Sequence, residues 1–163
     1  MTTIILIAIG LLTFVAMEGV SYATHRWVMH GPGMVWHRSH HSPATTRFEA
    51  NDLFPVVFAA IGFGMFLTAS LVGSAPLFCV AGGVTAYGVA YTFVHDIYIH
   101  RRVGVDVRDR PYLVWMRESH QLHHTLGGEP YGMLLPVVSA ARRAEAARRE
   151  ARRARTRETR SRL

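Results

Sequence analysis

The chain contains three long stretches in which apolar residues follow one another almost without interruption. They run from Ile4 to about Ala23, from Leu53 to Val72 and from Pro76 to Val94. The second and third stretches contain no charged residue, and Glu18 is the single charge in the first. A helix needs about 20 apolar residues to cross the hydrocarbon core of a membrane. The pattern therefore predicts three membrane-spanning helices.

Short polar segments mark where these helices begin and end. Gly73-Ser74-Ala75 alone joins the second stretch to the third, which predicts a tight hairpin. Asn51 and Asp52 precede the second stretch and predict an N-terminal helix cap, and Pro55 is tolerated in a first turn. The first stretch has no basic residue ahead of it and no clear cleavage site, so we interpret it as an anchor and not as a signal peptide.

The charge distribution predicts an orientation and a division of the chain. Half of the residues are hydrophobic and only 18% are charged, which is typical of membrane proteins. No Arg lies before Arg26 or between Leu53 and His100, so the positive-inside rule places the N-terminus and the hairpin outside. Residues 140–163 hold ten Arg and three Glu, whereas the rest of the chain has eight Arg and eight acidic residues. We therefore expect a membrane domain over residues 1–139 and a solvated, partly helical cytoplasmic tail over residues 140–163.

All ten histidines fall into one repeated spacing, His-x4-His followed by His-x2-His-His. The ten are His25, His30, His37, His40 and His41, and then His95, His100, His120, His123 and His124. Imidazole is the commonest metal ligand, and ten imidazoles buried without metal would leave many ring nitrogens unpaired. The pattern therefore predicts two metal centres on the cytoplasmic side. The expected fold is all-α, an integral membrane helical bundle of about three transmembrane helices with a histidine-rich helical cap.

Helix geometry gives expectations for both spacings. Each trio, such as His37, His40 and His41, lies within about 100° on one helical face, so it is expected to present three nitrogens to one region. Residues five apart, such as His25 and His30, diverge by about 140° on a helix. They converge only where the second histidine lies at a helix end or in a π-helical turn. Gly31-Pro32-Gly33 predicts such an end directly after His30.

The histidine ligands limit which metal ions could bind, but they do not identify the metal. All-nitrogen ligation suits zinc, iron, copper or nickel, and the order of affinities does not separate them. Two open, histidine-rich centres beside a lipid-embedded cavity favour iron and oxygen chemistry over a closed structural zinc site. Cys79 is the single cysteine, so this chain alone builds no disulfide, Cys-based zinc site or iron–sulfur cluster.

Glu18 and Asp96 are candidates for supporting the ligands. Glu18 precedes His25 by seven residues on nearly the same helical face, and it either orients His25 or hydrogen-bonds a neighbouring helix. Asp96 lies beside His95 and has the same two interpretations.

Two further features of the spans are interpreted as helix packing. Tyr87, Tyr91 and His95 form an i, i+4 stripe, for which packing is favoured over the wall of a substrate groove. Small residues in the second and third spans also favour close helix contacts; they are Gly62, Gly64, Gly73, Gly82, Gly83 and Gly88. No substrate-binding residue is assigned.

The order of the histidine clusters resembles the β-carotene hydroxylase family, within the wider membrane fatty-acid hydroxylase superfamily. The similarity includes further segments, from roughly Glu18 to Pro136; these are Phe48–Leu53, Tyr91–Asp96, His100–Arg102, His120–Thr125 and Gly127–Gly132. The chain departs from the family pattern only at the extreme N-terminus and in the Arg-rich tail.

The resemblance implies a non-haem di-iron monooxygenase of carotenoid biosynthesis, in which all ten histidines are ligands of two Fe²⁺ ions. Such enzymes use O2 to hydroxylate C3 of a β-ionone ring, converting β-carotene through β-cryptoxanthin to zeaxanthin. The chain contains no GxGxxG dinucleotide motif. Electrons are therefore expected from a reduced ferredoxin and an NAD(P)H-dependent reductase, with Arg101 and Arg102 as basic docking residues.

Other interpretations remain open from the sequence. Another membrane lipid, such as a fatty acid or a sterol, is an alternative substrate. A metal-transporting membrane protein is a further alternative, but it would need ligands in mid-membrane, and the second and third spans have none before His95. We do not expect nucleic-acid binding, because the basic tail follows a membrane domain. The expected location is the bacterial cytoplasmic membrane, as a multi-pass protein.

Overall fold

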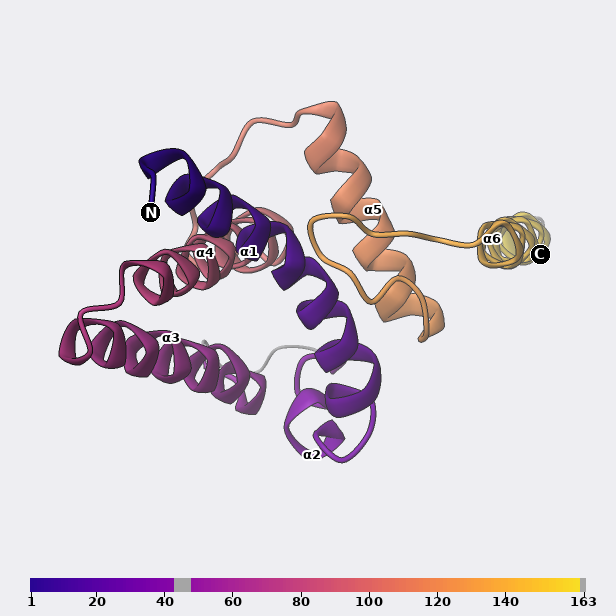
Figure 1. Cartoon of the computed structure of the whole chain (residues 1–163). Helices are drawn as coiled ribbons and strands as arrows, with labels where there is room; N and C mark the ends of the chain where they lie inside the picture. Colours follow the sequence, from indigo (N-terminus) through magenta and orange to yellow (C-terminus); the bar gives the residue numbers. More distant parts are fainter. Residues whose placement is uncertain (43–47, 162–163) are drawn as a thin grey trace.

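Three long apolar helices form the membrane part of the molecule (Figure 1). The computed structural model describes residues 1–42 and 48–161. The helices are α1 (Thr3–Ala23), α3 (Leu53–Leu71) and α4 (Ala75–Thr92). With the turns that extend them, each is long and apolar enough to cross a membrane. This confirms the three predicted spans, and the described residues form helices and turns without strands, as an all-α fold requires.

Helix α4 lies between α1 and α3 and packs against both, whereas α1 and α3 barely touch each other. The contact with α1 is close at Gly83, where an added Cβ would lie 2.7 Å from the Thr13 Cβ. Gly62 also faces a neighbour, the hydroxyl of Thr85. Added Cβ atoms at Gly64, Gly73, Gly82 and Gly88 would meet nothing within 4 Å, so the prediction of close packing is wrong for these four.

A short turn reverses the chain between α3 and α4, as predicted. Gly73 has a φ of +64°, a left-handed conformation that costs glycine little because it lacks a Cβ. Ser74 caps α4 by accepting a hydrogen bond from the Leu77 backbone N–H at 3.4 Å. The hairpin lies at the end of the bundle away from α5 (Pro111–Leu126) (Figure 1).

Helices α1 and α4 both continue into π-helical turns, Thr24–Met29 and Phe93–Ile99. In each turn the second histidine of the x4 pair hydrogen-bonds back to the first: His30 N donates to His25 O at 3.0 Å, and His100 N donates to His95 O at 2.9 Å. These i to i+5 bonds bring residues five apart onto one side of the helix. Both conditions expected from the spacing are thus met, since His30 and His100 also end their helices.

The first trio does not lie on one helix, contrary to the prediction. Helix α2 (Met34–His37) ends at His37, and His40 and His41 follow in turns. Ser39 and Ser42 explain the ending, because their hydroxyls donate to the carbonyls of Trp36 and Arg38 at 2.8 and 2.9 Å. Such bonds compete with continuation of the helix.

A segment without regular structure, residues 127–139, follows α5 and crosses the end of α1 (Figure 1). Glu18 of α1 holds this segment, since its carboxylate accepts hydrogen bonds from the backbone N–H groups of Leu134 at 3.0 Å and Leu135 at 2.9 Å. The same carboxylate accepts a bond from the Tyr87 hydroxyl of α4 at 2.7 Å. Glu18 therefore joins two spans to the segment over them.

Glu18→Ala is expected to lower the free energy of unfolding by about 3 kcal/mol, because donors in partly buried surroundings lose their acceptor. Glu18→Gln is expected to lose less, since one acceptor oxygen remains. Thermal unfolding of both variants in detergent micelles measures the effect. An alanine variant as stable as the parent protein would show that these bonds contribute nothing.

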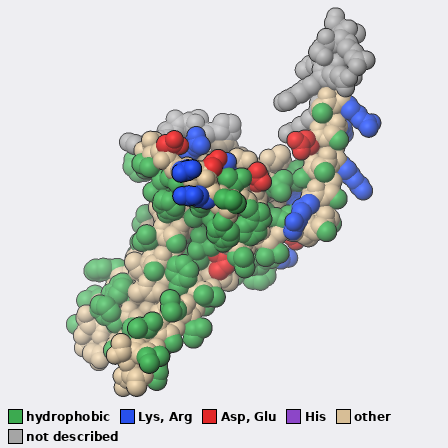
Figure 2. Space-filling view, turned by 90° about the horizontal axis from the view of Figure 1, so that it is seen from above, with side chains coloured by type: hydrophobic (Ala, Val, Ile, Leu, Met, Phe, Trp, Pro, Cys, Tyr) green, Lys and Arg blue, Asp and Glu red, His purple; other side chains and the backbone are tan. Residues whose placement is uncertain are grey.

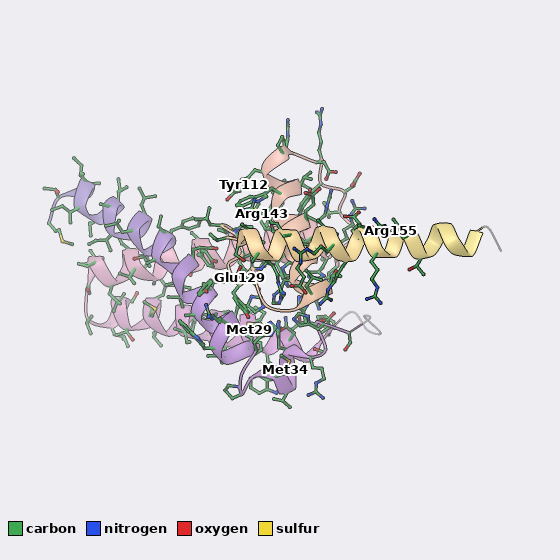
Figure 3. All side chains as sticks on the ribbon, turned by 90° about the vertical axis from the view of Figure 1, so that its right-hand side faces the viewer. Met29, Met34, Tyr112, Glu129, Arg143 and Arg155 are labelled. Carbon is green, nitrogen blue, oxygen red and sulfur yellow. The ribbon has the colours of Figure 1, made fainter. Side chains whose placement is uncertain are left out.

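Helix α6 (Ala140–Ser161) contains most of the basic tail and projects away from the bundle. Figure 3 shows it extending beyond the labelled Met29 and Met34, with Arg155 on its outer part. On the face shown in Figure 2, charged side chains gather at one end of the molecule and along this helix, and the opposite end is hydrophobic or uncharged. The division at residue 139 stays a prediction.

Candidate metal centre

The histidines gather in two groups at the ends of α1 and α4. Centre A contains His25, His30, His37, His41 and His123, and centre B contains His40, His95, His100 and His120. Within each group, one nitrogen from every ring lies within 4.8 Å of all the others. His25, His37, His40, His95, His120 and His123 are buried. Two compact sets of nitrogens are the arrangement expected of two metal centres.

His124 lies at the border between the two centres. Its Nε2 is 3.0 Å from His40 Nε2 and 2.9 Å from His120 Nε2, both in centre B. Its ring also stacks on His41 of centre A, with the ring centroids 4.6 Å apart. All ten predicted histidines are therefore brought together.

Each trio is divided between the two centres, so the prediction that a trio serves one region is wrong. His37 and His41 belong to centre A, but His40 between them belongs to centre B. On α5, His123 faces centre A whereas His120 faces centre B. The reason is that α5 crosses both centres, so residues three apart on it reach different neighbours.

Three rings of centre A are oriented by neutral oxygen acceptors. His25 Nδ1 donates to the Tyr131 carbonyl at 3.0 Å, His37 Nδ1 donates to the Asn51 amide oxygen at 2.7 Å, and His123 Nδ1 donates to the Gly128 carbonyl. An imidazole that donates through Nδ1 carries a lone pair on Nε2. These three rings therefore direct Nε2 lone pairs toward one another.

His25 Nε2 is buried and has no hydrogen-bond partner among the described residues. Native proteins rarely leave such a nitrogen unpaired, because the lost hydrogen bond is costly. A cation bound in centre A would satisfy this nitrogen together with those of His37 and His123.

Centre B is oriented by carboxylates. His95 Nδ1 donates to Asp96 at 3.1 Å, and His40 Nδ1 lies 3.5 Å from the carboxylate of Glu49. The Nε2 atoms of His40 and His95 then face each other at 3.1 Å. Because His95 donates its Nδ1 proton to Asp96, its Nε2 lone pair faces His40, and a cation between the two rings would accept it.

Asn51 was predicted as part of a helix cap, and the structure corrects this. Asn51 is buried, and its amide binds His37. Asp52 makes no side-chain cap to α3 itself, but it belongs to a capping box at the 3₁₀ turn Ala50–Asp52, which leads into α3. Its carboxylate accepts the Glu49 N–H at 3.0 Å, and it also accepts hydrogen bonds from Arg102 at 2.6 and 2.7 Å. The predicted capping is thus confirmed for Asp52, whereas the Asn51 side chain binds His37.

Glu18 does not orient His25 through any hydrogen bond among the described residues. Its contacts with Tyr87, Leu134 and Leu135 correspond to the alternative interpretation, binding to neighbouring elements. Glu18 is connected to His25 through the segment 127–139, because Glu18 binds Leu134 and Leu135 and His25 binds Tyr131 in that segment. Asp96, in contrast, contacts its histidine directly.

An apolar cavity of about 650 Å³ lies between α1, α3 and α4 and reaches the histidines. His25 of centre A and His95 of centre B both line it. Tyr87 and Tyr91 line it too, so the interpretation of their stripe as packing alone is wrong. Most other lining side chains are apolar or aromatic; they include Met17, Met29, Phe54, Phe58, Phe63 and Phe66.

Burial is the largest cause of low pKa values among the histidines outside the spans. Together with the neighbouring imidazoles, burial lowers the pKa of His37 to about 4, of His100 and His123 to about 3, and of His124 to about 2. The rings are therefore neutral near pH 7 and need not lose a proton to bind metal.

The metal-free protein is expected to lose stability as the pH falls below about 6.5. In the unfolded chain these imidazoles take up protons near pH 6.5, whereas in the folded protein they do so only near pH 4 or below. The unfolded chain thus binds more protons in this window, and acid favours it. Thermal unfolding from about pH 7.5 to about pH 4.5 should show a Tm that falls steadily. A constant Tm would contradict the low pKa values, and bound metal should move the fall to lower pH because metal competes with protons.

The chain matches the fatty acid hydroxylase family over residues 10–140. It belongs to this family. The family is iron-dependent, and the two histidine centres fit that requirement. Membership makes the protein a hydroxylating oxidoreductase.

Several curated relatives are similar to the chain over most of its length. The β-carotene hydroxylase of Pseudescherichia vulneris is 41% identical over 121 residues, covering 74% of this chain and 68% of the relative. That of Pantoea ananas is 39% identical over 118 residues, covering 72% and 67%. The chloroplastic β-carotene 3-hydroxylase 1 of Arabidopsis thaliana is 39% identical over 130 residues, which cover 74% of this chain and 41% of the relative. No solved structure matches the chain significantly.

Proposed function

We propose that the protein is a β-carotene 3-hydroxylase, a non-haem di-iron monooxygenase that converts β-carotene through β-cryptoxanthin to zeaxanthin. The observation that carries this proposal is the apolar cavity, because it ends on His25 and His95, one histidine from each centre. A substrate carbon placed at the His25 and His95 end of the cavity would lie next to both metal positions. The bacterial and plant relatives named above act on β-carotene, which identifies the lipid.

The cavity has the chemistry and position to take a carotenoid from the membrane. The groove lies between α1 and α3 with α4 as its third wall, and its mostly apolar lining suits a hydrocarbon substrate. Phe54, Phe58, Phe63 and Phe66 of α3 follow one another along it and offer aromatic faces to a rigid conjugated chain. A ring at the histidine end leaves the polyene extended along α3.

The distances between nitrogens fit metal ions of high coordination number. Neighbouring Nε2 atoms are 3.0 Å apart for His30 and His123 and for His37 and His41 in centre A, and 3.0 Å apart for His100 and His120 in centre B. Two nitrogens bound about 2.1 Å from one ion at a right angle are about 3.0 Å apart, whereas a tetrahedral angle gives about 3.4 Å. A hydrogen bond between two rings has the same length, so we favour iron because the family is iron-dependent.

Each part of the site has a defined task in the reaction. Two ferrous ions and O2, with two electrons and two protons from outside, supply the oxidant that turns a C–H bond into C–OH and releases water. The ten histidines hold the ions, and Asn51, Asp96 and the carbonyls of Tyr131 and Gly128 fix the ring orientations. The groove positions the β-ionone ring and excludes water from it.

Electrons must reach the centres from another protein, and we propose an acidic ferredoxin at the charged end of the molecule. Arg101 is exposed and follows His100 directly. Arg102 was expected to share this role, but it is bound to Asp52 at 2.6 Å and to Asp96 at 3.2 Å. We therefore assign docking to Arg101 and to Arg148 and Arg152 of α6, which are exposed. The positive-inside rule places this end in the cytoplasm.

Co-expression with a β-carotene-producing pathway in a bacterial host tests the proposal. We expect β-cryptoxanthin and zeaxanthin in the pigment extract, and about two irons per chain in the purified protein. A host carrying an inactive histidine variant at equal expression is the control. Unchanged β-carotene with iron bound and electrons supplied would overturn the carotenoid substrate, and analysis of hydroxylated fatty acids and sterols in the same cells would then identify another lipid.

A further inference from the structure

Both centres are built from histidine rings, five in centre A and four in centre B, but the groups beside these rings differ in charge. In centre A, the hydrogen-bond acceptors are two backbone carbonyls, of Tyr131 and Gly128, and the amide of Asn51, all neutral. In centre B, His95 donates to the carboxylate of Asp96, and the carboxylate of Glu49 lies 3.5 Å from His40 Nδ1.

The negative charge beside centre B is held in place and only partly neutralised. Arg102 binds Asp96 at 3.2 Å and both oxygens of Asp52 at 2.6 and 2.7 Å. One guanidinium thus binds the carboxylates of Asp52 and Asp96, and Glu49 adds a third carboxylate beside His40. These side chains are largely withdrawn from water, with exposed fractions of 24%, 19% and 14%.

A cation gains more from such surroundings than from neutral dipoles. An imidazole hydrogen-bonded to a carboxylate is a more basic metal ligand than one bonded to a carbonyl. Partly buried negative charge also attracts a divalent ion strongly, because the field is poorly screened there.

We propose that the two centres are unequal, and that centre B binds a divalent metal ion more tightly than centre A because Asp96 and Glu49 support its ligands. This inference rests on the proposed two-metal function. With one equivalent of metal, centre B is filled first. Centre A is then the position from which metal is lost when iron is scarce, and its neutral acceptors are the cause.

An anaerobic titration of the full-length, metal-free protein in detergent micelles with Co²⁺ and with Fe²⁺ tests the inference. Calorimetry should show two ions binding in two phases that differ in affinity by at least about tenfold. His120→Ala should remove the tighter phase, and His25→Ala should remove the weaker one. These two variants assign each phase to its centre without any measurement of activity.

Exchanging the charges gives the sharper test. Asp96→Asn should weaken the tighter phase by about 10- to 100-fold and leave the weaker phase unchanged. Asn51→Asp places a carboxylate beside His37 and should therefore strengthen metal binding in the weaker phase. This result would support the inference even if the Asp96→Asn variant did not fold properly. The double variant should bring the two affinities together or reverse their order. Gln121→Ala, an exposed neighbour of His120, should change neither phase.

The outcomes separate this inference from the proposed function. Two ions that bind with equal affinity overturn the inference and leave the two-metal centre intact. The inference is also overturned if Asp96→Asn weakens only the binding phase that His25→Ala removes, because that phase belongs to centre A. Binding of fewer than two ions by the parent protein overturns the proposed function and the inference together.

Discussion

Replacing His120 with alanine is expected to abolish hydroxylation while the three spans stay folded. His120 is buried in α5, and its Nε2 lies 3.0 Å from His100 Nε2 and 2.9 Å from His124 Nε2. Its removal takes one nitrogen from the middle of centre B. Because the metals supply the oxidant, zeaxanthin formation should fall by at least about a thousandfold. The bound iron should fall at the same time.

Gln121→Ala is the matched control for this prediction. Gln121 is the next residue on α5 and is exposed, and the hydrogen bond it receives from Thr125 goes to its backbone carbonyl. The substitution therefore changes the helix surface beside the ligand without changing centre B. We expect normal turnover and normal iron content. Pigment analysis of both strains at equal expression decides between the outcomes, and a His120→Ala strain that still makes zeaxanthin would contradict the assignment of His120 as a ligand.

The spacing of His25 and His30, and of His95 and His100, was enough to predict their local structure. A helix separates residues five apart, and only a helix end or a π-helical turn reunites them. This argument uses the backbone alone, so it needs no knowledge of neighbouring elements. The three spans were predictable for a similar reason, because the thickness of a membrane fixes the length of an apolar helix.

The division of the trios between two centres was not predictable from the same geometry. A helical position shows which face a side chain occupies, but not which of two nearby centres that face meets. His120 and His123 lie on one face of α5 and still reach different centres, because α5 crosses both. His40 leaves the helical path altogether, since the bonds of Ser39 and Ser42 end α2.

The groups that orient the ligand rings could not be predicted from the sequence, for a different reason. Every residue has a carbonyl, so nothing in the sequence distinguishes those of Tyr131 and Gly128. Asn51 does carry a signal, but Asn before a helix is more typical of a cap than of a partner for a histidine. Glu49 precedes Asn51 by two residues, and its position alone does not predict that it lies beside a histidine.

Gly88→Leu is expected to block the groove and stop hydroxylation without loss of iron. Gly88 lines the cavity on α4, between Tyr87 and Tyr91, and an added Cβ there would meet nothing within 4 Å. A leucine side chain has room at this position only by entering the groove or the surrounding lipid. Where it enters the groove, it occupies the path of the polyene next to the histidine end. We expect turnover to fall by at least about tenfold, because a displaced ring no longer meets both centres.

The same helix offers a matched control, Gly82→Leu. Gly82 also has open space around it, but it does not line the cavity, since six residues along a helix turn the side chain to another face. Both variants add the same apolar surface to α4, so a general effect on insertion or folding should appear in both. Gly88→Ala should remain close to the parent protein. Equal activity of the two leucine variants, with iron retained in each, would mean that the substrate reaches His25 and His95 by a route other than this groove.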